Sequence, residues 1–446
     1  MTSRIGILIL FAGAIAFAPP DAAAQYDKYF PEGTDSSAKD QPVVAGIAIF
    51  GNEQTQEEII LREMTLQVGD KVSFEKLLEC KMRIYNLGLF NSVDISYPPM
   101  DSTVLVVDVS ERWYFFPVPL VGIVDRDWSQ WYYGAGVTHR NFRGRAENIF
   151  LGGVLGYNPW VSVAYSNPWV FGNSHFFTGS EVKYQQIENK NKLARGTVPE
   201  FDEFRFSVSQ NFGKRLDDYR RVWLHGAYNY VEVTDPTAEL TVSDGGIDRY
   251  FTLGIAASHD SRDIIEYPMN GINSVVGVTK KGIGNNVDYV SYSADLRIYR
   301  PLFSGTSLGM RVFSRVVSGP TVPDYENVFF GFGERIRGHF STRYEGQNIL
   351  GLSLEYRIPI IKPTNLQLSF IPIPQFNNFR FGLYAAAFFD AGKTWYKHER
   401  VNLDEAPSGY GAGIHLLLPY GFVFRFDYAF NNLGEGEPIF DVKASF

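Results

Sequence analysis

The sequence has 446 residues and only one cysteine, Cys80. A single thiol cannot form an internal disulfide, so a disulfide framework does not hold this chain together. Beyond the first 24 residues, no uninterrupted apolar run reaches about eighteen residues, which argues against a helical membrane span. Positive charge is not in excess either, because the formal net charge is −8, and we expect no nucleic-acid partner.

Patterns that carry catalysis or bind cofactors are also scarce. The stretch "GTSLG", residues 305–309, matches the G-x-S-x-G pattern of a nucleophile elbow. That elbow requires a turn from a strand into a helix, whereas this stretch begins an expected strand. The seven histidines show no H-E-x-x-H spacing, and there is no cysteine-based metal spacing. Because no nucleotide-binding motif is present either, we expect no enzyme activity, no cofactor and no metal.

The first 24 residues are typical of a secretory signal. Arg4 precedes an apolar run over residues 5–17, and Ala22 and Ala24 occupy the small-residue positions of a cleavage site. Residues 25–41, where the mature chain would begin, are polar, of mixed charge and aperiodic, which predicts a linker.

Residues 42–112 predict a small α+β domain with the order strand, helix, helix, strand, strand. Thr55 and Glu58 have the spacing of a capping box at the start of the first helix, and Ser73 is expected to cap the second. Gly88 follows the second helix as a stop signal. With "GN" after the first strand and "YNLGLFNSVDI" between the second helix and the second strand, this order resembles a POTRA domain, a periplasmic binding module.

From residue 113 to the end, side chains alternate with the period of a β-strand. The stretch "FVFRFDYAF", residues 422–430, has only aromatic side chains on one face, while Arg425 and Asp427 lie on the other. An aromatic face opposite a charged face suits a strand between lipid and a polar lumen.

The number of such segments decides between two kinds of sheet. About sixteen strand candidates follow residue 113, and no helical segment is available to cover a sheet. A soluble β-sandwich would alternate in the same way, but a closed sheet is the form that satisfies every backbone group of the strands in lipid. We therefore predict a transmembrane β-barrel of about sixteen antiparallel strands over residues 113–446, preceded by one α+β domain.

The stretch "GFGERIRGHF", residues 331–340, lies in the expected connection between the eleventh and twelfth barrel strands, residues 318–347. In the next strand, "FRFGLYAAAFFDAGKTW", one face is wholly apolar, so Asp390 on the other face must point into the lumen. An aspartate inside a barrel needs a cationic partner, and Arg337 is the candidate. Such an arginine, flanked by glycine, can approach the wall where Gly392 leaves room. The alternative is that both residues are ordinary lumen charges of a pore.

Two motifs give this pair a family context. "IRGHF" resembles the motif hydrophobic-Arg-Gly-aromatic on loop six of the BamA, TamA and FhaC superfamily, and "FFDAG" resembles its Phe-x-Asp-x-Gly motif on strand thirteen. The corresponding residues are Ile336, Arg337, Gly338 and His339 on the loop and Phe388, Asp390 and Gly392 on the strand. The resemblance extends to "NFRGRAENIFLGG", "DSRDIIEYPMNG" and "GAGIHLLLPYGFVFRFDYAF", and so covers nearly the whole mature chain. His339 departs from the pattern, because a phenylalanine or tyrosine is usual there.

The first expected barrel strand carries Pro117 and Pro119 two residues apart, so both remove a ladder donor on the same side. The short last strand has Phe440 and Phe446 on its apolar face. If the prolines face that strand, the seam between the first and last strands is the weakest in the barrel. Our hypothesis is that this seam opens laterally to template an incoming strand. The alternative is that the prolines only end the first strand early.

The family resemblance implies an assembly factor in the outer membrane of a diderm bacterium, with the POTRA domain in the periplasm and loop six held in the lumen by the arginine–aspartate pair. It would assist the insertion or folding of β-barrel proteins, or the translocation of polypeptides. Its partners would be unfolded outer-membrane or secreted polypeptides and outer-membrane lipid, while accessory periplasmic or lipoprotein subunits stay open. Two other functions also stay open: a dedicated secretion pore for one partner protein, and a passive channel or anchoring scaffold.

Overall fold

The computed structural model describes residues 42–97, 102–123, 129–188, 202–235, 240–283, 286–331, 333–340, 342–367, 378–418 and 422–442. The expected signal (1–24), the expected linker (25–41) and Phe446 lie outside these residues. Within the described ranges, every helix is too short or too polar to cross a membrane.

The amino-terminal domain has the predicted order of elements. It consists of β1 (Val43–Phe50), α2 (Glu57–Leu61), α3 (Phe74–Asn86), β2 (Phe90–Ser96) and β3 (Ser102–Glu111). The sheet order is β1-β3-β2, with β1 parallel and β2 antiparallel to β3. Apolar side chains from both helices and the sheet, among them Ile60, Ile84 and Leu105, are fully buried between these two layers. Burial of these side chains provides the main driving force for folding so small a domain.

One of the two predicted helix caps is present and the other is wrong. Ser73 caps α3, because its side chain accepts a hydrogen bond from the backbone N–H of Lys76. Thr55 does not cap α2, which begins one residue later than the capping box requires and has no side-chain cap. The carboxylate of Glu111, at the end of β3, accepts bonds from both the backbone N–H and the hydroxyl of Thr55, at 2.7 and 2.6 Å. A charged acceptor forms the stronger hydrogen bond, so this contact replaces the cap.

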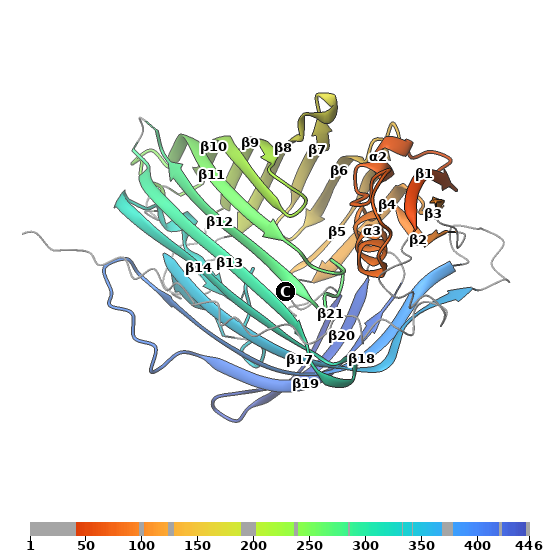
Figure 1. Cartoon of the computed structure of the whole chain (residues 1–446). Helices are drawn as coiled ribbons and strands as arrows, with labels where there is room; N and C mark the ends of the chain where they lie inside the picture. Colours follow the sequence, from red (N-terminus) through yellow and green to blue (C-terminus); the bar gives the residue numbers. More distant parts are fainter. Residues whose placement is uncertain are drawn as a thin grey trace, which may run out of the picture. The chain divides into compact units, whose positions relative to one another are not determined.

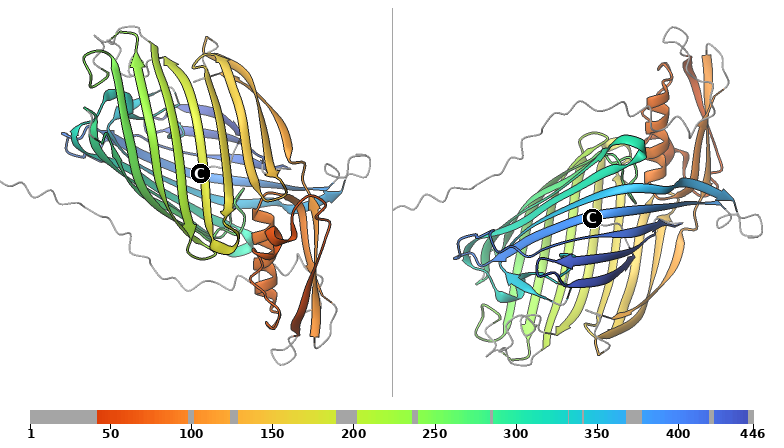
Figure 2. Two further views of the ribbon diagram at one scale, coloured as in Figure 1. Left: turned by 90° about the horizontal axis from the view of Figure 1, so that it is seen from above. Right: turned by 90° about the horizontal axis from the view of Figure 1, so that it is seen from below.

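The rest of the chain forms one sheet of sixteen strands, each antiparallel to its neighbours (Figures 1 and 2). The strands are β4 (Phe115–Ile123), β5 (Trp131–Phe142), β6 (Glu147–Gly156), β7 (Trp160–Val170), β8 (Phe176–Glu188), β9 (Asp202–Arg215), β10 (Arg220–Val233), β11 (Ile247–Asp260), β12 (Gly271–Lys281), β13 (Asp288–Pro301), β14 (Ser307–Thr321), β17 (Asn348–Gln367), β18 (Asn378–Trp395), β19 (Ser408–Leu417), β20 (Val423–Asn431) and β21 (Gly436–Val442). The sheet curls round into a barrel wall, as Figure 2 shows from two sides. Its edge strands are β4 and β21, and no ladder pair between these two is found in the described part of the chain.

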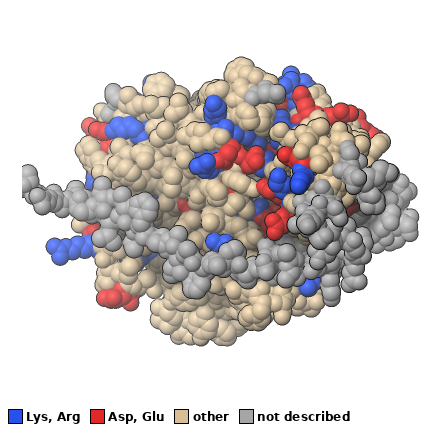
Figure 3. All heavy atoms as spheres, in the orientation of Figure 1, with Lys and Arg blue, Asp and Glu red and all other residues tan. Residues whose placement is uncertain are grey.

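The two faces of the sheet differ as the alternation predicts. On β20, Phe426, Tyr428 and Phe430 are exposed on the outer face. Arg425 and Asp427, between them, are at most 5% exposed because they point inward. In Figure 3, charged side chains gather in the middle and right of the view, while broad areas of the wall carry none. This distribution suits a wall with lipid outside and a polar interior.

The connection between β14 and β17, called loop six here, covers residues 322–347. It is shorter than predicted at its start, because β14 continues to Thr321. The loop has internal structure: a short 3-10 helix η4 (Asp324–Glu326), and an antiparallel pair of β15 (Val328–Phe330) with β16 (Tyr344–Gly346). Residues 331–340 lie between these two short strands.

Candidate functional site

Arg337 of loop six and Asp390 of β18 form a two-pronged ion pair. The Nε of Arg337 lies 2.6 Å from one carboxylate oxygen and its Nη2 lies 2.8 Å from the other. The backbone N–H of Arg337 donates to the same carboxylate at 3.2 Å. Arg337 is 8% exposed and Asp390 is 5% exposed, so both charges are almost fully removed from solvent. The structure therefore brings together the two residues that the motifs single out.

Further groups surround the Arg337 guanidinium. Its Nη1 contacts Glu355 of β17 at 3.1 Å and Asp427 of β20 at 3.4 Å. Its Cζ also lies 3.6 Å from the centre of the Phe388 ring. Five donors in a planar fork allow an arginine to serve several acceptors at once. The guanidinium thereby connects three strands that are not all neighbours in the sheet.

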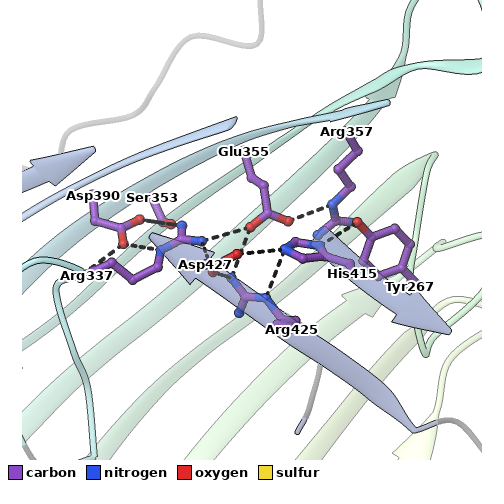
Figure 4. A network of polar contacts seen from close by, with 9 residues as sticks. All are labelled: Tyr267, Arg337, Ser353, Glu355, Arg357, Asp390, His415, Arg425 and Asp427. Atoms are coloured by element: carbon purple, nitrogen blue, oxygen red, sulfur yellow. Dashed lines mark hydrogen bonds and ion pairs between the residues drawn. The ribbon is translucent and has the colours of Figure 1, made fainter. Parts of the chain in front are cut away.

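Arg337 belongs to a larger buried network, drawn in Figure 4. The other members are Tyr267, Ser353, Glu355, Arg357, Asp390, His415, Arg425 and Asp427. Glu355 is fully buried and joins three arginines, with Arg357 at 2.8 Å on one oxygen and Arg337 and Arg425 on the other. Arg425 joins Asp427 at 2.7 Å. Three arginines face three carboxylates, so the buried charges balance, as burial of ionised groups requires.

The residues next to Arg337 fix the loop in other ways. Ile336 is buried against Phe330 and Ile349. Gly338 has a positive φ of 97°, a conformation that side chains rarely adopt, and it lies against the backbone of β20. Its N–H donates to Glu437 of β21 at 3.0 Å. Loop six is therefore tied to the last strand as well as to β18.

His339, which stands where the motif leads one to expect phenylalanine or tyrosine, is held by hydrogen bonds and by an edge-on contact with the Tyr344 ring, 5.8 Å away between ring centres. Its Nε2 lies 2.9 Å from the side-chain oxygen of Asn432 and 3.1 Å from the carbonyl oxygen of Ser408. Its Nδ1 lies 3.2 Å from the hydroxyl of Tyr344. The ring is 6% exposed, so the substitution keeps a buried, well-partnered side chain at this position.

The prediction for Gly392 was wrong in its detail. A Cβ at Gly392 would overlap the ring of Phe330, so this glycine makes room for a phenylalanine of loop six and not for Arg337. The close approach of Arg337 occurs at Gly409 of β19, where a Cβ would overlap the Arg337 carbonyl oxygen. Gly409 and Gly411 lie on the same face of one strand, and this pair of glycines was the sequence signal for a close approach of another segment.

A second anchor of loop six was not predicted. Glu326, on η4, contacts Lys281 of β12 at 2.7 Å and Arg315 of β14 at 3.4 Å, and it accepts a hydrogen bond from Tyr250 of β11 at 3.0 Å. Here an acid of the loop is bound among basic side chains of the wall, the reverse of the Arg337 site. Sequence periodicity could not reveal it, because η4 has no strand pattern of its own.

A cavity of about 620 Å³ lies beside the Arg337 site. Its lining includes Arg297 and Arg311 from the wall, Phe330 and Arg337 from loop six, and Asp441 from β21. Loop six and the last strand therefore border the same open space.

The expected seam has a definite hydrogen-bonding geometry on the β4 side. The N–H of Arg140 bonds to the carbonyl of Tyr114, in the same register as the ladder between β5 and β4. Because hydrogen-bonded pairs alternate along an antiparallel ladder, residues 117 and 119 turn their backbone groups away from β5. Pro117 and Pro119 therefore leave out two N–H donors at the outer edge of β4.

On β21, too, a proline turns its backbone away from the neighbouring strand, and this proline was not predicted. The N–H of Asn431 bonds to the carbonyl of Glu435, in register with the ladder between β20 and β21. By the same alternation, residue 438 turns its backbone away from β20. Pro438 therefore omits a donor at the outer edge of β21, so both edge strands have proline at the side where a partner strand would pair. Phe440, on the same strand, is 65% exposed on the outer face.

Family profiles match both parts of the chain. The Omp85 superfamily domain matches residues 141–440, and the POTRA profile, described as surface antigen variable number repeat, matches residues 42–112. The amino-terminal domain is accordingly called the POTRA domain below.

Individual relatives are distant in sequence. The outer membrane protein assembly factor BamA of Nitratidesulfovibrio vulgaris is 23% identical over 412 residues, covering 86% of this chain and 48% of that protein. The chain thus spans about half the length of the curated relative it matches. The crystal structure of BamA from Haemophilus ducreyi lacking POTRA domains 1–3 has a TM-score of 0.54 at 18% identity, covering 90% of this chain and 83% of that one. CdiB from Escherichia coli also has a TM-score of 0.54, at 13% identity, covering 91% and 75%. At these identities the solved structures show a likeness of fold.

Proposed function

Because the chain belongs to the Omp85 superfamily, we propose that it is an assembly factor that assists the insertion and folding of β-barrel proteins or the translocation of polypeptides. The protein is an outer-membrane β-barrel with its POTRA domain in the periplasm. Its curated relative is named an outer membrane protein assembly factor, which supports the proposal. Its partners would be unfolded outer-membrane or secreted polypeptides and the surrounding lipid.

The observation that carries the proposal is the set of bonds that Arg337 makes with Asp390, Glu355 and Asp427. With the POTRA domain in the periplasm, loop six starts from the extracellular end of the barrel, and these bonds hold it inside the lumen. We call this arrangement the loop-six lock. A lumen filled in this way is poorly suited to a passive channel, and this favours a role in which the wall of the barrel acts on the client.

The wall offers one place for such an action. Pro117 and Pro119 on β4 and Pro438 on β21 remove donors from the two edges that would meet at the seam of a closed barrel. A seam with fewer hydrogen bonds opens at a lower free-energy cost than any other ladder of the barrel. An opened edge can then pair with an extended client segment by β-augmentation. Folding of the client would supply the free energy, since the chain has no nucleotide-binding motif.

Assisted folding in liposomes tests the proposal. The mature chain is reconstituted, a urea-unfolded barrel client is added, and protease-resistant client is followed over time against empty liposomes. We expect the intact chain to accelerate client folding and Arg337→Ala to lose most of the acceleration, because the lock is broken. Arg220→Ala is the control, since it removes an arginine that pairs with Asp217 in the turn between β9 and β10, away from loop six.

The outcomes separate the proposal from its alternatives. Equal acceleration by Arg337→Ala and the intact chain would leave the lock without a role in the function. Absence of acceleration by the intact chain, across several clients, would refute the assembly role and direct attention to a secretion pore for one partner protein.

A further inference from the structure

The turn between β11 and β12, residues 261–270, contacts the POTRA domain. Asn86, the last residue of α3, donates to the carbonyl oxygen of Asp263 at 2.9 Å and accepts from the N–H of Ile265 at 3.1 Å. Arg112, which follows β3, contacts Glu266 at 3.4 Å. The turn is therefore bound by both its backbone and its side chains to one face of the POTRA domain.

The next residues of the same turn enter the buried network of the barrel. The hydroxyl of Tyr267 lies 2.8 Å from Nδ1 of His415, and its ring lies under Arg357, whose Cζ is 4.2 Å from the ring centre. Arg357 also donates to the carbonyl oxygen of Pro268 at 2.6 Å. Tyr267 is only 3% exposed. Its side chain is buried inside the barrel, at the end where the turn contacts the POTRA domain.

From these contacts two short routes lead to Arg337. On one route, Glu355 joins Arg357 to Arg337 through its two oxygens. On the other route, Asp427 lies 3.2 Å from Nε2 of His415 with one oxygen and 3.4 Å from Arg337 with the other. Figure 4 shows the second route as a row of dashed contacts from Tyr267 to Arg337, and the first route as one from Arg357 to Arg337.

We propose that the turn of residues 261–270 is a strap that couples the position of the POTRA domain to the loop-six lock, with Tyr267 as its positioning residue. When the POTRA domain moves and Asn86 releases the turn, Tyr267 withdraws from His415 and Arg357. His415 then loses a hydrogen-bond partner and Arg357 loses the ring of Tyr267, and Glu355 and Asp427 shift their bonds away from Arg337. Buried charges respond strongly to such a loss, because no water replaces the missing partner. This inference concerns the barrel itself and does not depend on which polypeptide is handled.

Tryptic cleavage of loop six at Arg335, which is exposed, measures the release of the lock without any client. Asn86→Ala removes the two bonds of Asn86 to the turn and leaves that of Arg112 with Glu266, whereas Tyr267→Phe removes only the hydroxyl that contacts His415. Each is expected to accelerate cleavage about fivefold, the equilibrium factor of one hydrogen bond. The double variant is expected to resemble Tyr267→Phe, because the strap is already uncoupled. Circular dichroism and heat-modifiability in gels confirm that each variant is folded.

A matched control distinguishes an effect of the strap from a general effect of weakening the contact between the POTRA domain and the barrel. Glu79 of α3 accepts a hydrogen bond from Tyr219, in the turn between β9 and β10, which lies outside the network of Arg337. Burial and this bond raise the pKa of the Tyr219 phenol to about 12, so it stays a donor at neutral pH. Glu79→Gln is therefore expected to leave loop-six cleavage unchanged. Equal effects of Asn86→Ala and Glu79→Gln, or effects of Asn86→Ala and Tyr267→Phe that multiply in the double variant, would overturn the proposal.

Discussion

At the scale of single residues, Arg337 is one member of a charge-balanced group and not half of an isolated pair. Its removal leaves three carboxylates, those of Asp390, Glu355 and Asp427, facing two arginines, Arg357 and Arg425, within the network of Figure 4. We expect Arg337→Ala to lower the free energy of unfolding by about 3 to 5 kcal/mol, the cost of an uncompensated buried charge. Adding Asp390→Asn removes the excess charge, so the double variant should regain about 1 kcal/mol or more relative to Arg337→Ala.

Urea unfolding in detergent micelles, followed by tryptophan fluorescence, measures these differences. Asp390→Asn alone completes the double-mutant cycle. Strict additivity of the two single changes would contradict the coupling that the bonds between Arg337 and Asp390 imply.

Residue-level predictions succeeded where a contact depends on strand periodicity. Alternation placed Asp390 on the inner face, and the two motifs supplied Arg337 as its partner. Periodicity could not place Tyr267, because residues in a turn carry no alternating pattern. The capping box at Thr55 failed for a related reason: the competing acceptor, Glu111, is 56 residues away in sequence. Local signals cannot report a partner that only the tertiary fold supplies.

At the scale of elements, the number of hydrogen bonds that the seam can form depends on which backbone groups of β4 and β21 face outward from the sheet. Pro438→Val would restore a donor on β21 without changing β4, the edge on which a client could still pair. Where β4 and β21 close the barrel as we propose, a stronger seam opens less often, so we expect slower client folding and a higher temperature of barrel unfolding in gels. One added hydrogen bond contributes about 0.5 to 1.5 kcal/mol, which corresponds to a rate reduced about two- to tenfold.

Pro359→Val is the control for this change, because Pro359 lies in the interior strand β17, opposite Tyr384 of β18, and not at an edge of the sheet. Faster client folding by Pro438→Val would show that β21, and not the closed seam, limits the reaction. The prolines of β4 were visible in the sequence. The sequence does not show which neighbouring strand these prolines face. That depends on which residues of β4 are hydrogen-bonded to β5, and the sequence of one strand does not determine this pairing.

At the scale of the whole molecule, sixteen strands were predicted because each repeats the same inside–outside alternation, and the sheet has that number. The attachment of the POTRA domain to the barrel could not be predicted in this way. It depends on contacts between turns and helices that lie far apart in the sequence. Glu63 is the clearest example, since it contacts Arg83 of α3 at 3.0 Å and Arg215 at the end of β9 at 3.1 Å.

A change at Glu63 therefore tests how strongly the barrel holds the POTRA domain in place. Glu63→Gln keeps the size of the side chain but leaves Arg83 and Arg215 close together without a shared carboxylate. A hydrogen bond to a charged group contributes about 1.5 to 3 kcal/mol, so amide exchange in α3 should accelerate about tenfold or more. Hydrogen–deuterium exchange by mass spectrometry measures this, with Glu75→Gln on the exposed first turn of α3 as the control. The barrel itself should keep its heat-modifiability, because Glu63 contributes nothing to the ladders of the sheet. Unchanged exchange in Glu63→Gln would mean that other contacts, such as that of Arg112 with Glu266, suffice to hold the domain in place.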